Sequence, residues 1–84
     1  MTQDNTYRTS DTALAAFLIT AQYVLLYIDY DQPRFEFVFP DSNQLIDSVN
    51  AYISGHAITE PNAFARVNRK LLRILHKRCQ WEED

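Results

Sequence analysis

The stretch "YVLLYIDYDQPRFEFVF", residues 23–39, decides the fold class. Residues 23–29 form a continuous branched and aromatic run, which is typical of a strand buried on both sides. In the second half Phe35, Phe37 and Phe39 alternate with Glu36 and Val38, so one face is apolar. Pro33 lies between the halves in a polar segment with turn chemistry. The stretch predicts an antiparallel β-hairpin.

Residues before the hairpin predict a short strand and a helix. "TYRT", residues 6–9, can form the strand, and Ser10 is the expected N-cap of the helix, with Asp11 favourable at its positive end. The apolar residues that follow have the i, i+3, i+4, i+7 spacing of one helical stripe: Leu14, Phe17, Leu18 and Ala21.

Two further helices are expected after the hairpin. Asp41 or Ser42 can cap the first, and Gly55 suits the left-handed residue at its end. Its apolar stripe consists of Leu45, Ile46, Val49, Tyr52 and Ile53. Pro61 fits the first turn of the second of these helices, which should run to about Cys79. "HAITE", residues 56–60, could be either a loop or an edge strand.

The expected order is β-α-β-β-α-(β)-α, a two-layer α+β domain with an antiparallel hairpin and a basic amphipathic C-terminal helix. If residues 56–60 form a strand, the order becomes the split βαβ of ferredoxin-like folds plus one helix. Eighty-four residues suffice for a single core. We expect a flexible N-terminus at 1–5, a single domain at 6–81 and an acidic tail at 82–84.

Composition excludes several classes of protein. A hydrophobic content of 46% argues against a disordered chain. The single cysteine, Cys79, excludes an internal disulfide framework and a cysteine-rich zinc site. The first residues lack the features of a signal peptide, and no apolar run is long enough to span a bilayer. These observations predict a soluble cytoplasmic protein without membrane contact.

Charge is distributed very unevenly along the chain. Residues 1–60 carry a net charge of −6, residues 61–81 carry +6, and the tail carries −3. At 100° per residue, one face of the last helix collects five cations while the opposite face is apolar. Arg78 strays toward the apolar edge. The predicted binding residues are Arg66, Arg69, Lys70, Arg73 and Lys77.

Several interpretations of this cationic face remain open. It could contact the phosphates of DNA or RNA, bind an acidic protein surface or a second copy of the chain, or be a solvated helix face. A helix-turn-helix is an alternative, because Ala51 and Gly55 have suitable offsets, although Pro61 is unfavourable there. "RFEFVF", residues 34–39, loosely resembles the base-stacking strand of RNA recognition modules, but three Phe on one face more often form a core.

No residue pattern predicts catalysis, a cofactor or a metal. His76 and Cys79 have i, i+3 spacing but lack two further ligands, and His56 follows a helix-ending glycine. Asp29, Asp31 and Glu36 cluster near the hairpin without a nucleophile or a phosphate-binding loop. We therefore expect a protein that is not an enzyme. A hydrolase that uses these acids is the catalytic alternative.

Four features in order carry a resemblance to a known family: "YRTSDTALAAFL", the "FEFVF" strand, a glycine followed by a Glu-Pro step, and "AFARVNRKLLRIL". Over residues 6–78 the chain resembles a domain-of-unknown-function family of short bacterial and phage-borne proteins. The resemblance implies a small accessory protein of mobile-element origin and assigns no site residue. Taken together, the sequence predicts a non-enzymatic protein that binds nucleic acid or a nucleoprotein complex through its C-terminal basic helix. The alternative is a protein-interaction module or homodimer that uses the same helix or an unpaired edge of the sheet.

Overall fold

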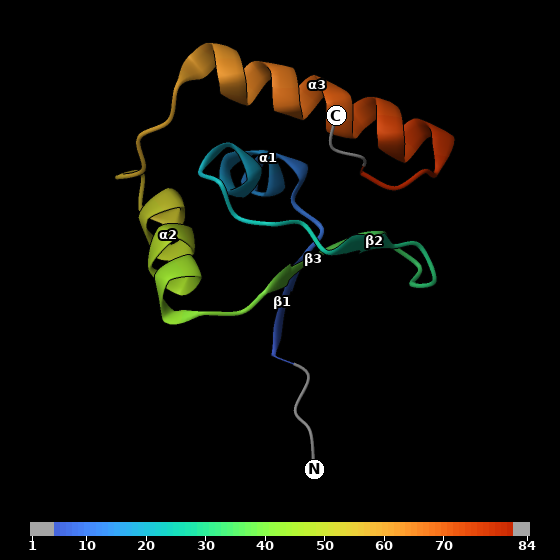
Figure 1. Cartoon of the computed structure of the whole chain (residues 1–84), viewed down its shortest axis with the longest axis horizontal. Coiled ribbons are helices and arrows are strands. Elements are labelled where there is room, and N and C mark those ends of the chain that lie inside the picture. The colour runs from blue at the N-terminus through green and yellow to red at the C-terminus, as the bar shows by residue number, and fades with distance from the viewer. Residues whose placement is uncertain (1–4, 82–84) are drawn as a thin grey trace.

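Three strands form one antiparallel sheet in the order β1-β3-β2, with β3 in the middle (Figure 1). The computed structural model describes residues 5–81. The strands are β1 (Thr6–Thr9), β2 (Tyr27–Asp29) and β3 (Glu36–Pro40). Residues 1–4 of the predicted flexible start and the predicted acidic tail at 82–84 lie outside the described residues. The predicted α+β class and the strand at 6–9 are confirmed.

The predicted hairpin is present, but its first strand is shorter than expected. β2 and β3 pair antiparallel, with Ile28 opposite Phe37. The expectation that residues 23–29 form a strand buried on both sides is wrong. Residues 23–26 precede the strand, and Val24 and Leu26 are exposed there. Within β2, at the edge of the sheet, Ile28 is buried and Tyr27 is exposed. A continuous apolar run does not distinguish a central strand from such an edge strand with its preceding loop.

The two faces of the sheet have different surroundings. Phe37, Phe39 and Ile28 point into the hydrophobic core with the helices. On the opposite face Val38 stands in register between Arg8 and Tyr27. Val38 is nevertheless fully buried, because the longer side chains of its neighbours cover it. The predicted alternation of β3 is confirmed, and Val38 is buried on the outer face as well.

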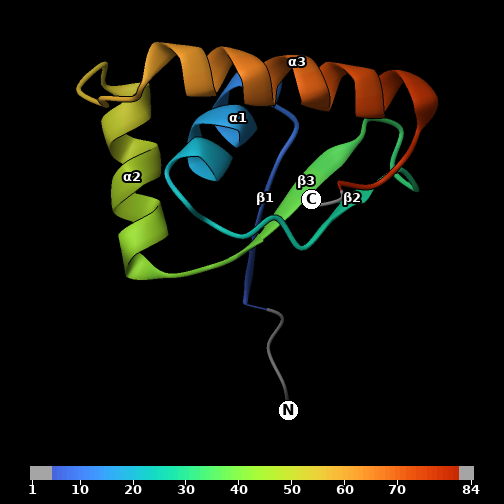
Figure 2. The same cartoon turned by 45° about the horizontal axis from the view of Figure 1, so that its top comes forward.

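Helix α1 (Thr12–Thr20) occupies the centre of the molecule (Figures 1 and 2). It buries five consecutive residues, Leu14 to Leu18, because the sheet lies on one side and the other helices lie around it. A single apolar stripe was therefore too narrow a prediction, and Ala21 is exposed. Ser10 is also not the N-cap. The Asp11 carboxylate accepts the N–H of Leu14, while the Ser10 hydroxyl donates to the carbonyl of Phe35.

Helix α2 (Asn43–Ile53) is capped by Ser42, and Gly55 takes the predicted left-handed conformation after it, with φ of 82°. Residues 56–60 form a loop, so the described chain contains no fourth strand and the ferredoxin-like alternative is excluded. Helix α3 (Pro61–Lys77) follows and lies across α1 on the side away from the sheet (Figure 2). It ends two residues before the predicted Cys79. Within residues 5–81, no helix combines the length and the apolar character needed to cross a membrane.

Candidate functional site

Helix α3 has the predicted amphipathic character. Leu71 is fully buried, and further apolar side chains of the helix pack beside it against the core: Phe64, Val67, Ile74 and Leu75. These residues fix the rotation of the helix about its own axis, so its cationic face points away from the core. Of the five predicted binding residues, Arg66, Arg69, Arg73 and Lys77 are exposed and Lys70 is half-buried.

The exposed cations are not neutralised by carboxylates of the described chain. Between residues 5 and 81, the ion pairs join Arg8 to Asp29 and to Glu36. Arg66, Arg69, Arg73 and Lys77 make no ion pair with this part of the molecule, so their charges face solvent. We call these four residues together with Lys70 the cationic face of α3.

The nearest acid on the helix itself is the N-cap, Glu60. Its carboxylate accepts hydrogen bonds from the backbone N–H groups of Asn62 and Ala63. These two bonds, with a smaller contribution from the charge of Arg66, lower the pKa of Glu60. The Glu60 carboxylate thus caps the start of the helix, where a negative charge is favoured.

Three of the cations line a surface pocket of about 400 Å³ with an aromatic wall. The lining residues are Arg66, Val67, Lys70, Arg73 and Trp81. The ammonium group of Lys70 lies 4.1 Å from the centroid of the Trp81 ring, a cation–π distance. The pocket thus combines positive charge with a flat apolar surface. Arg69 and Lys77 lie on the same face but do not line it.

Trp81 was not predicted as a site residue. It lies after the end of α3, where helical periodicity no longer assigns a direction to a side chain. Arg78 takes a left-handed conformation with φ of 56°, and the chain turns back there. A lone tryptophan after an acid-free basic helix was the available signal in the sequence. The sequence does not show, however, that this tryptophan lies beside the cations of α3.

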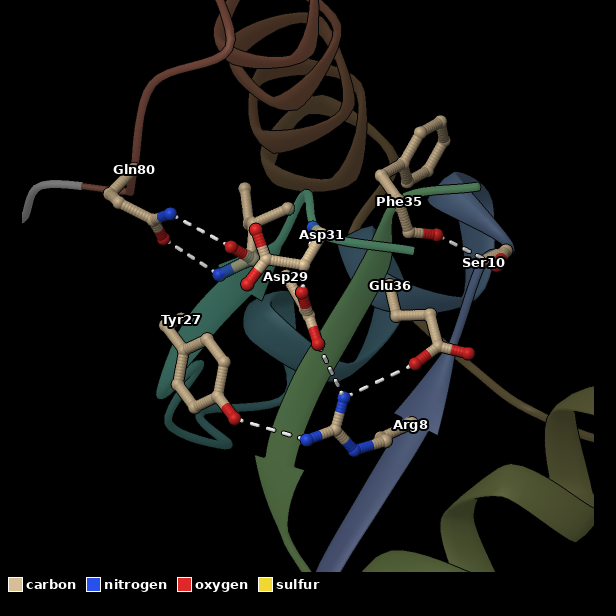
Figure 3. A network of polar contacts seen from close by, with 9 residues as sticks. Arg8, Ser10, Tyr27, Asp29, Asp31, Phe35, Glu36 and Gln80 are labelled. Carbon is tan, nitrogen blue, oxygen red and sulfur yellow. Dashed lines mark hydrogen bonds and ion pairs between the residues drawn. The ribbon is translucent and has the colours of Figure 1, made fainter. Parts of the chain in front are cut away.

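The segment 78–81 is held against the free edge of β2. The Gln80 side-chain amide makes two hydrogen bonds to Ile28: its oxygen accepts the Ile28 N–H at 2.6 Å, and its nitrogen donates to the Ile28 carbonyl at 2.8 Å (Figure 3). This pair reproduces the bonds of a neighbouring strand. The Tyr30 hydroxyl donates to the carbonyl of Cys79, and the Arg78 guanidinium lies 4.8 Å from the centre of the Tyr30 ring. The fold therefore fixes the position of Trp81.

The acids of the hairpin serve a structural network on the outer face of the sheet. Arg8 donates to Asp29 at 3.0 Å, to Glu36 at 3.2 Å and to the Tyr27 hydroxyl (Figure 3). A hydrogen bond from the N–H of Asp31, followed by those from Arg8, lowers the pKa of Asp29. The carboxylates of Asp29 and Glu36 are thus both hydrogen-bonded to the Arg8 guanidinium.

Two nucleic-acid alternatives do not fit the geometry. Phe37 and Phe39 are fully buried, so they cannot stack on bases as the aromatics of an RNA recognition module do. A helix-turn-helix requires α2 and α3 to be joined by a short turn, but residues 54–60 separate them and α3 packs chiefly against α1. His76 and Cys79 belong to no group of three or more His, Cys, Asp or Glu side chains placed to hold a metal among the described residues.

Comparisons of the chain with protein-family models, with curated proteins and with solved structures found no match.

Proposed function

We propose that this protein is a non-enzymatic cytoplasmic binding protein that contacts the phosphate backbone of nucleic acid, alone or within a nucleoprotein complex, through the cationic face of α3. The observation that carries the proposal is that Arg66, Arg69, Arg73 and Lys77 project from one helix face without an ion pair in residues 5–81. The resemblance to bacterial and phage-borne accessory proteins agrees with such a role and stays a prediction.

The spacing of the cations suits a polyanion. Arg66, Lys70, Arg73 and Lys77 follow each other at i, i+4, i+7 and i+11, which extends about 16 Å along a helix with a rise of about 1.5 Å per residue. A nucleic-acid strand presents one charge per about 3.4 Å of helix axis, so the row can meet several phosphates. Residues 1–60 are net negative and favour an approach in which α3 faces the polymer.

Salt dependence of binding tests the proposal. Anisotropy titrations of a labelled oligonucleotide at several salt concentrations give the slope of log affinity against log salt. Arg69→Ala combined with Arg73→Ala should reduce this slope by about 1.4 for a single strand or about 1.8 for a duplex. Arg34→Ala, in the exposed loop between β2 and β3, is the control and should leave the slope unchanged. A double variant with the slope of the natural protein contradicts backbone contact through α3.

The second candidate function is protein interaction, including a homodimer. Its support is that large apolar side chains lie exposed at the end of α2, in the loop after it and on α3: Ile53 at 72%, Ile58 at 93% and Leu72 at 52%. An interface built on these residues would be apolar and nearly insensitive to salt. Sedimentation velocity at low and moderate salt separates the two functions, because a salt-resistant dimer that Ile58→Ser disrupts supports the interaction module.

A further inference from the structure

We propose that the pocket of Arg66, Lys70, Arg73 and Trp81 binds one nucleotide of a single-stranded nucleic acid, with the base taking the place of the Lys70 ammonium over the Trp81 ring and the flanking phosphates on Arg66 and Arg73. This inference rests on the proposed function and specifies its substrate class. The pocket is lined by cations and by an indole, which are the two groups that single-strand-binding surfaces combine.

The base-stacking step distinguishes single strands from duplexes. In a duplex the faces of the bases are covered by their neighbours, so an indole at the protein surface cannot reach them without unstacking the helix. In a single strand a base can leave its stack at low cost and lie against an aromatic ring. A pocket of about 400 Å³ lies in the size range of small-ligand sites and can hold one nucleotide.

The position of Trp81 supports a ligand-facing role. Its side chain is half-buried: it packs against the core from one direction, and it forms part of the pocket wall. The Gln80–Ile28 amide pair precedes it directly and anchors it to the sheet edge. Arg66 and Arg73 lie seven residues apart on α3, about 10 Å along its axis, so their charges can reach phosphates on both sides of one nucleoside.

The competing explanation is that Trp81 only covers the aliphatic part of α3, with Lys70 lying over its ring. This explanation predicts that single-stranded nucleic acid binds by charge alone. Trp81 is the single tryptophan of the chain, so its fluorescence reports on this pocket without interference from a second indole. The two explanations therefore differ in one measurable signal.

The test titrates the full chain with an oligothymidylate of about twelve nucleotides, with a duplex of the same length, and with heparin as a polyanion that has no bases. Stacking should quench Trp81 emission to saturation with the single strand. It should leave the emission nearly unchanged with the duplex and with heparin. Anisotropy of labelled ligands records binding independently in the same solutions.

Two variants keep the result decisive. Trp81→Leu keeps apolar bulk but loses the aromatic face, and it should weaken single-strand binding about tenfold while duplex binding stays within about twofold. Trp81→Phe keeps a stacking ring and should retain most of the affinity. Circular dichroism of both variants checks that the fold persists. If Trp81→Leu unfolds, the affinity of Trp81→Phe and the quenching of the natural protein still test whether a base stacks on Trp81.

The outcomes separate this inference from the function on which it rests. If single strand and duplex bind equally, Trp81 emission does not change and Trp81→Leu has no effect, the nucleotide pocket is wrong while backbone contact through α3 stands. If no nucleic acid binds at low salt, or the Arg69 and Arg73 substitutions have no effect on binding, the proposed function itself is wrong, and the pocket assignment falls with it.

Discussion

Leu71 and Leu72 are neighbours in α3, yet they have opposite surroundings. Leu71 is fully buried against the core, whereas Leu72 is 52% exposed. One step along a helix turns a side chain by about 100°, so the two leucines point in clearly different directions. The position of each around the helix axis, rather than its hydrophobicity, determines its contribution to stability.

Leu71→Ala should therefore lower the free energy of unfolding by about 2–5 kcal/mol, because it removes a buried side chain and leaves a cavity. Leu72→Ala is the matched control and should change it by less than about 0.5 kcal/mol. Urea denaturation followed by circular dichroism measures both. Equal losses for the two variants would contradict the orientation of α3.

Two carboxylates make folding sensitive to acid. The pKa of Glu60 is lowered by backbone N–H donors, and the pKa of Asp29 is lowered by a backbone N–H and by Arg8. A carboxyl group whose pKa is lower in the folded chain stabilises the fold above its unfolded pKa and loses this contribution as the pH falls through the folded value. We expect the free energy of unfolding to fall as the pH drops below about 4.5, near the ordinary pKa of a glutamate.

Glu60→Gln should flatten part of this acid dependence, because the variant has no proton to take up at the start of α3. Glu60→Asp keeps a charged cap and should preserve it. Urea denaturation over a series of pH values measures the slopes. Identical acid profiles for the natural protein and Glu60→Gln would show that the cap does not couple folding to protons.

Among the elements, β2 depends most on a distant part of the chain. It has three residues and pairs with β3 on one side only. On its outer side the Gln80 amide takes the place of a neighbouring strand. An uncovered edge is a place where another chain can add a strand, and Gln80 occupies this position at Ile28.

Gln80→Ala should lower the stability by about 1–2 kcal/mol through the loss of two hydrogen bonds. The amide of Ile28 should exchange its hydrogen about tenfold faster, which hydrogen-exchange NMR measures at that residue. Gln44→Ala, at an exposed position in the first turn of α2, is the control and should leave Ile28 protected. Unchanged exchange at Ile28 in Gln80→Ala would contradict the edge contact.

At the level of the whole molecule, salt should act on binding far more than on folding. The ion pairs between residues 5 and 81 are confined to Arg8 on the outer face of the sheet, and surface pairs of this kind contribute little to stability. Arg66, Arg69, Arg73 and Lys77, by contrast, make no ion pair within residues 5–81, and under the proposed function an external polyanion neutralises their charges.

Raising the salt concentration from about 50 to about 200 mM should weaken single-strand binding about 50-fold if four phosphates are contacted. The urea midpoint of unfolding should barely move over the same range, because hydrophobic burial provides most of the stability. Parallel titrations of binding and of unfolding test this. A binding constant that resists salt would favour the apolar interaction module instead.

The sequence by itself determined β3, α2, α3 and the direction of the cationic face. The alternation of apolar and polar residues predicted β3. Serine and glycine marked the ends of α2, and proline marked the start of α3. The 3.6-residue period placed the cations opposite Leu71, because periodicity is a local property of the chain. Only the tertiary structure decided that β2 is a short edge strand, that α1 is buried on several sides, and that Trp81 closes a pocket with Arg66 and Arg73. Those features depend on contacts between segments far apart in the sequence, such as Gln80 with Ile28, and local periodicity carries no information about them.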